Sequence, residues 1–351
     1  PPPPPPPPPP PFFFQAYHGI RDAQESRGLG DVYKRQNMDN LKKVGLTALG
    51  TVLVAGSAHA ATMDVTGSTS LFFNGEDNSD KGNGWSMTDS IHFKASGEMD
   101  NGWTVSTAIE LDAAGTNGTG AGADRSIAID FGDMGKLTFS GDGGSGPIGA
   151  WDDVTPSANE EAHGVSVAGT QDGAANDAVD DNIFIFDYTA MDGVALKASY
   201  TPSNTTTSID SSSELGVLYT GIDGLSVYAA MGENNAAANS ADLSMFAVVY
   251  TAGAFSVGYQ MNETDYGTGT DDEDFTALGV SYAVSDDLSI SINQSTVDEE
   301  GSTEDQEAGA VSFSYTTGGM TISGTHASMD NVGGTATSDN TGYELNFVFA
   351  F

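Results

Sequence analysis

Five carboxylates in one long stretch without a repeating pattern are the first candidates for chemistry. The stretch runs from Gly141 to Asp181, and the acidic residues concerned are Asp152, Asp153, Glu160, Glu161 and Asp172. Paired carboxylates can serve as general acid and base in glycoside hydrolysis. Acidic pairs occur throughout this chain, however, so a solvated acidic loop is the competing interpretation, and we expect no enzyme. A segment of about forty residues without periodicity is nevertheless often functional.

Other catalytic or metal-binding patterns are missing from the sequence. The chain has no cysteine, which excludes disulfides, thiol nucleophiles and cysteine-ligated metals. His92, His163 and His326 are widely separated and lack the spacing of zinc ligands. The glycine-rich GDGGSG is not followed by a lysine-bearing helix, so no phosphate-binding loop is expected. We predict no catalytic residue, no cofactor and no metal centre.

The charge of the chain limits its partners. Eleven Lys and Arg residues stand against 49 Asp and Glu residues, which gives a formal net charge of -38. Nucleic acid is not expected as a partner, because phosphate binding needs clustered basic residues. A strongly acidic, glycine-rich composition is typical of disorder. The apolar residues of this chain are regularly spaced, however, and that spacing predicts a folded protein.

Two segments at the amino-terminal end are set apart from the fold. Residues 1–37 begin with a proline and phenylalanine homopolymer and include DVYKRQ, which reads as a translated sequencing adapter, so we expect an artefact. Residues 38–60 contain two lysines, an apolar run from Val44 to Ala55 and the tripeptide Ala58-His59-Ala60. This order predicts a secretory signal peptide, with a buried helix of a soluble protein as the alternative. The remaining domain spans residues 61–351.

A recurring unit fills much of that domain. Five tyrosines each precede a short turn and then an alternating strand, at intervals of 31, 31, 32 and 33 residues. They are Tyr188, Tyr219, Tyr250, Tyr282 and Tyr315. One interval matches a hairpin plus a longer return loop. Tyrosines repeated at the turn ends of a barrel would form an aromatic girdle, since the ring is apolar and the hydroxyl is polar.

Alternation of apolar and small polar residues predicts the two faces of the strands. Residues 255–262, FSVGYQMN, and residues 343–351, YELNFVFAF, are examples. About sixteen such segments of roughly eight to twelve residues follow Met63, separated by short turns and longer loops in alternation. We predict an all-β, transmembrane antiparallel β-barrel. A soluble sandwich also alternates, but the signal peptide, the tyrosine girdle and the terminal Phe351 favour the barrel.

Three stretches resemble the Gram-negative general porins, in particular those of marine and alphaproteobacterial type. They are DFGDMGKLTFSG, DNIFIFDYTAMDGVALKASY and the aromatic carboxyl-terminal end, and the resemblance covers residues 61–351. It implies an outer-membrane barrel of sixteen strands, a homotrimer, short periplasmic turns and long extracellular loops. It also implies that the third loop folds into the lumen. In this family a terminal phenylalanine, here Phe351, is read by the outer-membrane assembly machinery.

The resemblance gives the acidic stretch a role as the pore constriction. Its five carboxylates would narrow the lumen and favour cations. The family places an arginine cluster on the opposite wall, and this chain departs from that pattern. The inward-facing candidates are His92, Lys94, Lys136 and Lys197, whereas Arg125 shares the outward parity of Ile127. The PEFGG motif of enterobacterial constriction loops is also absent.

The interpretation is therefore a passive outer-membrane porin for small hydrophilic solutes and ions, weakly selective for cations. Its partners would be the lipid bilayer and lipopolysaccharide. The acidic segments TDDED and DEEGSTEDQE could bind Ca²⁺ or Mg²⁺ weakly, or be merely solvated. One alternative is a secreted acidic, β-rich adhesin or Ca²⁺-binding surface protein. Another is a solute-specific barrel, which would need an aromatic ladder in the lumen, and Tyr228 alone is a candidate for it.

Overall fold

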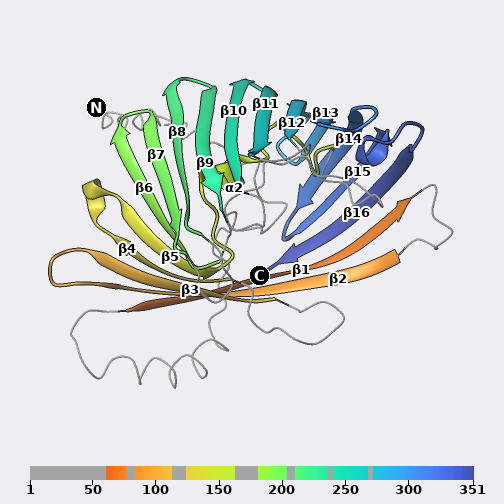
Figure 1. Cartoon of the computed structure of the whole chain (residues 1–351). Coiled ribbons are helices and arrows are strands. Elements are labelled where there is room, and N and C mark those ends of the chain that lie inside the picture. Colours follow the sequence, from red (N-terminus) through yellow and green to blue (C-terminus); the bar gives the residue numbers. More distant parts are fainter. Residues whose placement is uncertain are drawn as a thin grey trace, which may run out of the picture.

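One closed β-barrel accounts for nearly all of the described chain. The computed structural model describes residues 61–76, 84–112, 124–162, 181–203, 210–235, 240–267 and 272–351. Sixteen antiparallel strands each pair with their neighbours in the sequence, and β16 pairs with β1, as Figure 1 shows. The prediction of an all-β antiparallel barrel is confirmed. The adapter artefact and the signal peptide fall in residues 1–60, which lie outside the described residues.

The strands differ in length around the barrel. Their bounds are β1 Thr62–Glu76, β2 Gly84–Glu98, β3 Thr104–Asp112, β4 Arg125–Asp130, β5 Lys136–Asp142, β6 Ile183–Met191, β7 Val194–Thr201, β8 Ser212–Ile222, β9 Leu225–Asn234, β10 Ala241–Ala252, β11 Phe255–Tyr266, β12 Glu273–Ala283, β13 Leu288–Glu299, β14 Gln306–Thr317, β15 Met320–Asp330 and β16 Asn340–Ala350. One short α-helix, α2 (Pro147–Trp151), follows β5, and 3-10 turns η1 (Gly132–Met134) and η2 (Val332–Gly334) lie in connections. No helix among the described residues has the length and apolar character needed to cross a membrane.

Short and long connections alternate, so the barrel has a turn end and a loop end. The turn end carries tight hairpins such as Asp192-Gly193 between β6 and β7 and Asp223-Gly224 between β8 and β9. Gly193 and Gly224 have φ of 75° and 74°, in the left-handed region that hairpin turns require and that favours glycine. The loop end carries the longer connections, and the longest joins β5 to β6.

The barrel closes through its first and last strands. The register between β1 and β16 runs from the Ser68–Ala350 pair to the Glu76–Gly342 pair. One step further, Gly67 and Phe351 exchange two backbone hydrogen bonds, each of 2.8 Å. A Cβ added to Gly67 would lie 2.9 Å from Phe351 Cε2 and 3.0 Å from the carbonyl oxygen of Ser90. The terminal ring therefore covers a position that only glycine fits.

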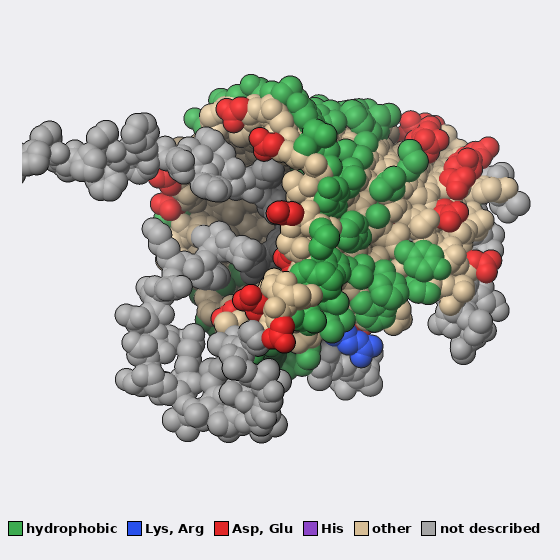
Figure 2. Space-filling view, turned by 90° about the vertical axis from the view of Figure 1, so that its left-hand side faces the viewer, with side chains coloured by type: hydrophobic (Ala, Val, Ile, Leu, Met, Phe, Trp, Pro, Cys, Tyr) green, Lys and Arg blue, Asp and Glu red, His purple; other side chains and the backbone are tan. Residues whose placement is uncertain are grey.

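The two faces of the wall follow the predicted alternation. Ile91 and Leu111 lie directly opposite each other on β2 and β3 and are exposed on the outside. Figure 2 shows the result as a belt of hydrophobic side chains on the outer surface, with carboxylates towards the two ends. In β8, where the sequence allows either parity, Leu215 and Val217 face outward, while Leu218 lies opposite Tyr228 on the inner side.

The five repeated tyrosines lie near the turn end, each on an even-numbered strand from β6 to β14. Tyr219, Tyr250 and Tyr315 are exposed on the outer surface. Tyr188 stacks on Phe186 of the same strand, and the Tyr282 ring lies 4.5 Å from that of Phe255. The structure thus arranges them as an outer row at one level, and their role as membrane-interface anchors stays a prediction.

Replacing Gly67 by valine should weaken barrel closure. The new side chain has to displace Phe351 or the β2 backbone, and overpacking of this kind costs about 1–3 kcal/mol. The measurement is the temperature at which the folded form converts to the unfolded form on a detergent gel, and we expect it to fall. Gly309→Val is the matched control, because a Cβ at Gly309 meets no atom within 4 Å. An equal fall in both variants would show that the contact with Phe351 is unimportant.

Candidate functional site: the loop inside the barrel

A loop folded into the barrel forms the candidate site. It follows β5, and its residues 143–162 are described. Pro147 is the first residue of α2, where its missing N–H would have had no helical partner. The backbone N–H of Ile148 donates to Glu214 Oε2 of β8 at 3.0 Å. The loop therefore begins its course against the inner wall at β8.

Trp151 at the end of α2 fills a space that a wall glycine leaves open. Its ring makes a T-shaped contact with Tyr228 of β9, with ring centroids 5.7 Å apart. A Cβ on Gly216 would lie 2.3 Å from Trp151 Cζ3. Both aromatic residues belong to a buried apolar cluster with Ile148 and Leu243. Tyr228, the predicted inward aromatic residue, does face the interior, but the loop covers it.

Gln260 of β11 holds the next part of the loop. Its side chain is 1% exposed. Its Oε1 accepts the backbone N–H of Val154 at 3.0 Å, and its Nε2 donates to the carbonyl oxygens of Trp151 and Asp152. Asn262 Oδ1 also accepts from this Nε2, at 3.1 Å. One amide side chain thus satisfies three backbone groups of the loop. It can do so because an amide carries both a hydrogen-bond acceptor and a hydrogen-bond donor.

Two opposed glycines make room where the loop comes closest to the wall. Gly258 of β11 and Gly279 of β12 are directly paired. A Cβ on Gly258 would lie 2.5 Å from Pro156 Cδ, and one on Gly279 would lie 2.8 Å from Pro156 O. Asn293 of β13 donates from Nδ2 to the same carbonyl oxygen at 3.1 Å. The loop backbone therefore lies directly on the inner wall at these strands.

Hydroxyl groups on β13 to β15 hold the end of the described segment. Ser291 Oγ accepts the backbone N–H of Ala158 at 2.9 Å, and Thr325 Oγ1 accepts that of Glu160 at 3.2 Å. Ser312 Oγ donates to Glu160 O at 2.9 Å. Asn159 Nδ2 also donates to Glu344 Oε1 of β16 at 3.2 Å. The hydrogen bonds of the described loop residues thus follow the wall from β8 to β16, on the side of the barrel away from β2–β6. The prediction that the third loop folds into the barrel is confirmed.

The predicted constriction carboxylates are not equally available to the lumen. Asp152, Asp153 and Glu160 are partly exposed, whereas Glu161 is 2% exposed. Burial raises the pKa of the Glu161 carboxyl well above its usual range, and the charge of the hydrogen-bonded Asp153 raises it further. The Glu161 carboxyl is therefore biased towards its neutral form. Asp172, the fifth predicted residue, lies outside the described residues.

Lys136 and Lys197 lie on the lumen side and share one carboxylate. Lys136, Asp187 and Lys197 are directly opposed on β5, β6 and β7, and the row continues to the inward Gly216. Lys136 Nζ lies 3.5 Å from Asp187 Oδ2, and Lys197 Nζ lies 3.4 Å from Asp187 Oδ1. The two predicted wall lysines are therefore partly neutralised where they stand, because directly opposed opposite charges attract.

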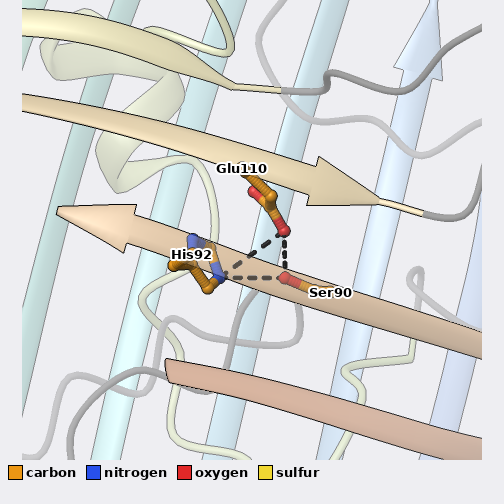
Figure 3. Close-up of polar contacts among 3 residues, drawn as sticks. All are labelled: Ser90, His92 and Glu110. Carbon is orange, nitrogen blue, oxygen red and sulfur yellow. Dashed lines mark hydrogen bonds and ion pairs between the residues drawn. The ribbon is translucent and has the colours of Figure 1, made fainter. Parts of the chain in front are cut away.

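His92 and Lys94 lie on the lumen face of β2, and His92 belongs to a polar group of three residues. Figure 3 shows Ser90, His92 and Glu110 turned towards one another from two adjacent strands. His92 Nε2 lies 3.0 Å from Ser90 Oγ and 3.5 Å from Glu110 Oε1, and Ser90 Oγ donates to Glu110. A hydrolytic triad needs serine and carboxylate on opposite ring nitrogens. Here both contact the same nitrogen.

Further carboxylates gather around this group and at the loop end. Burial raises the pKa of Asp124, which precedes β4, to about 6, with the nearby charge of Glu110 as the second cause. A surface cavity at the loop end is lined by residues of DEEGSTEDQE, among them Asp298, Glu304 and Asp305. In the described part of the chain, no three His, Asp or Glu side chains are placed to hold a metal ion.

The residues that fasten the loop were missed by the sequence analysis. Gln260, Asn293, Ser291 and Thr325 are single inward polar residues among many, with nothing in their spacing to mark them. The pairing of Gly258 with Gly279 can be recognised only once the register of β11 and β12 is known. Glu214 is an inward carboxylate with a structural partner, the N–H of Ile148, and it looks like any other acidic residue in the sequence.

Comparisons with known proteins agree with this architecture. A sequence model of the Gram-negative porin family matches residues 45–351. A search of curated proteins finds no match. Among solved structures, the chain is similar to an anion-selective porin from Comamonas acidovorans, with a TM-score of 0.64 and 13% identity over 83% of this chain and 100% of that one.

Two further solved structures have the same fold. OmpT of Vibrio cholerae in its trimer form has a TM-score of 0.64 and 18% identity, over 83% of this chain and 100% of that one. A mutant of the Rh. blastica porin has a TM-score of 0.61 and 15% identity, with the same coverage. A closed barrel with an inward loop defines the class as outer-membrane channel barrels. The chain belongs to the Gram-negative porins, and its location is the outer membrane.

The raised pKa of the buried Glu161 carboxyl should make loop docking depend on pH. The docked loop has a raised carboxyl pKa, so docking is most stable below the usual pKa and weakens as pH rises towards the raised value. We expect single-channel current noise to increase as the pH rises above the ordinary glutamate pKa of 4.5. Glu161→Gln should remove the dependence, because an amide still donates to Asp153 but does not titrate. Asp152→Asn should retain it, and a flat wild-type profile would contradict the prediction.

Loss of the Gln260 amide should loosen the same loop by another route. Gln260→Leu leaves the N–H of Val154 and two carbonyl groups without their wall partner, and one unsatisfied buried group costs about 1–3 kcal/mol. We expect faster proteolysis of the loop and unstable open-channel current, with the barrel still heat-resistant. Gln294→Leu is the control, since Gln294 lies on the exposed outer face of β13. Identical digestion of the two variants would rule out this anchoring role.

Proposed function

We propose that the protein is a passive, water-filled diffusion channel for small hydrophilic solutes and ions, weakly selective for cations. The observation that carries the proposal is the balance of charges on the inner wall facing the loop. Side chains directly opposed in the barrel share a face. The lysines on this lumen face are Lys94, Lys136 and Lys197, and the carboxylates in register with them or with His92 are Asp64, Glu110, Asp130 and Asp187. Carboxylates therefore outnumber lysines even before the loop is counted.

The acidic loop adds to this negative lumen on the opposite side. Asp152, Asp153 and Glu160 are partly exposed there. Rings of carboxylates raise the local concentration of cations. Because Asp187 contacts two of the three wall lysines, the transverse field between wall and loop is weak. Weak selectivity for cations follows, and similarity of fold to an anion-selective porin at 13% identity does not bear on it.

A channel without catalysis or cofactor fits the described interior. The group of Ser90, His92 and Glu110 has the wrong geometry for nucleophilic catalysis, as both partners contact one nitrogen of the ring. A solute-specific aromatic ladder finds no support, because Tyr228 is 9% exposed beneath Trp151. The acidic outer loops would hold Ca²⁺ or Mg²⁺ only weakly. Family membership favours the channel over the alternative of a secreted adhesin.

The working form that we propose is a homotrimer embedded in lipid and lipopolysaccharide. The similar OmpT of Vibrio cholerae is recorded in a trimer form, and the exposed apolar belt of this chain provides surface for both lipid and subunit contacts. Phe351 would serve as the signal for the outer-membrane assembly machinery. The residue is 65% exposed, so it remains accessible although its backbone closes the barrel.

The decisive experiment is a planar-bilayer recording of the protein from residue 61 onward, with a KCl gradient across the membrane. Steady conductance with a reversal potential of cation-selective sign is the expected result. Conductance with anion selectivity would overturn the proposed role of the lumen carboxylates and leave the channel intact. Absence of any conductance would overturn the channel itself.

Asp187→Asn should shift selectivity towards anions. The substitution removes the carboxylate shared by Lys136 and Lys197 and leaves two unneutralised positive charges on the lumen wall. We expect the cation-to-anion permeability ratio, measured from the reversal potential, to fall by about two- to threefold, as expected for an energy change below about 1 kcal/mol for a partly exposed pair. Asp223→Asn, in an exposed turn, is the matched control. An unchanged ratio in the Asp187 variant would exclude this pair as a determinant of selectivity.

A further inference from the structure

Three titratable side chains meet on the lumen wall near the start of the inward loop. His92 of β2 and Glu110 of β3 are directly opposed, and His92 Nε2 lies 3.5 Å from Glu110 Oε1. Ser90 joins them, because its Oγ lies 3.0 Å from His92 Nε2 and donates to Glu110 Oε1, as Figure 3 shows. The backbone N–H of Glu110 donates to the carbonyl oxygen of Asp124 at 2.8 Å. An imidazole and two carboxyl groups therefore lie next to one another.

Asp124 also contacts the first residues of the loop. A side chain on Gly143, the residue after β5, would collide with the Asp124 carboxylate, and the φ of 68° at Gly143 favours glycine. Asp142, the last residue of β5, lies close enough for its charge to act on Asp124. The hydrogen bonds that dock the described loop follow the wall from β8 to β16. The group therefore lies where the loop leaves the wall, on a different side of the barrel from the docking contacts.

The charges within this group depend on one another. Partial burial and the charge of Glu110 raise the pKa of Asp124 to about 6, Asp142 adds to the rise, and the charge of His92 opposes it. An imidazole ordinarily changes its charge between about pH 5 and about pH 8. Carboxyl groups with ordinary pKa values are already ionised above about pH 5. A group of this composition therefore becomes more negative in a pH range where most carboxylates keep their charge.

Other charged side chains on the neighbouring strands give the group little compensation. In strand order they are Asp64 of β1, Lys94 of β2, Asp112 of β3, Arg125 of β4 and Asp142 of β5. Arg125 has the outward parity of Ile127, which directs its charge away from the lumen. Lys94 is thus the one inward Lys or Arg among the described residues of β1–β4. The His92 side chain is 32% exposed, so the group exchanges protons with the water of the lumen.

We propose that His92, Glu110 and Asp124 form a pH-sensitive charge on the lumen wall, and that the channel loses its preference for cations as the solution becomes mildly acidic. This inference rests on the proposed channel and adds its regulation. In mildly acidic solution the imidazole is protonated and Asp124 is neutral, so one positive and one negative charge remain. In mildly alkaline solution the imidazole is neutral and both carboxylates are ionised. The wall then carries two negative charges, which raise the local concentration of cations.

Reversal potentials at several pH values give the first test. In a planar bilayer with a KCl gradient, the cation-to-anion permeability ratio of the wild-type channel should rise by roughly two- to threefold from about pH 5 to about pH 8, the size of effect expected for partly exposed charges. The double variant His92→Gln with Asp124→Asn should lose most of this rise. Asp112→Asn removes another carboxylate of the same wall and, as the matched control, should retain it. A flat wild-type ratio, or an equal rise in the double variant, would overturn the inference.

The effect is separate from the pH dependence of loop docking. Glu161→Gln should remove the pH dependence of the current noise and retain most of the rise in the permeability ratio. Loss of both in this variant would assign the ratio to Glu161 and overturn the inference.

Carboxyl NMR gives a second test that does not depend on conductance. In detergent-solubilised protein with carbon-13-labelled aspartate, the resonance that Asp124→Asn removes belongs to Asp124, and its titration midpoint should lie at about pH 6. Glu110→Gln should lower that midpoint because a like charge is lost, and His92→Gln should raise it because a positive charge is lost. Unchanged midpoints in both variants, or shifts in the reverse directions, would show that the three groups do not act together.

The inference and the proposed channel fail in distinguishable ways. Protein that conducts with a permeability ratio independent of pH would reject the pH-sensitive wall charge and leave the channel standing. Protein that never conducts but shows the two opposite NMR shifts would reject the channel and support the coupling of the three groups.

Discussion

Completion of the backbone hydrogen bonds in lipid is the constraint on which the rest of the structure depends. An open sheet edge has no water to bond with in a membrane, so the first and last strands have to pair. In this chain the last step of that pairing joins Gly67 and Phe351. Once the ring is closed, strand alternation assigns each side chain to lipid or lumen, and the apolar belt and polar interior follow from one pattern.

The interior is organised by the loop rather than by a packed core. The wall supplies small inward residues, and several polar ones bind specific backbone groups of the loop. Gln260 binds three such groups, and the opposed Gly258 and Gly279 let the backbone reach the wall. Apart from the carboxylates of Glu214 and Glu344, the wall side chains that hold the loop are neutral amides and hydroxyls. The other charged groups therefore remain available to determine the potential inside the channel.

Much of the fold was predictable because its signal is local and repeated. Apolar and polar residues alternate along each strand, and a unit of one hairpin and one longer loop repeats about every thirty residues. Together these two repeats predict the number of strands, the separation of a turn end from a loop end, and the tyrosines on the even-numbered strands. The lumen parity of Lys94, Lys136 and Lys197 follows from the same alternation. The partners of these residues were not predictable. Asp187 meets two lysines only because three strands are in one register, and Glu161 meets Asp153 only because the loop turns back on itself.

The sequence by itself determined the class of fold, the family and the two faces of the wall, since each depends on residues close together along the chain. Tertiary structure alone decided which carboxylates are neutralised and which wall residues hold the loop. It also decided which titratable groups meet at the start of the loop. The physical reason is that electrostatic and hydrogen-bond energies depend on distance in space. Residues more than a hundred positions apart, such as Val154 and Gln260, come together only when the barrel has closed.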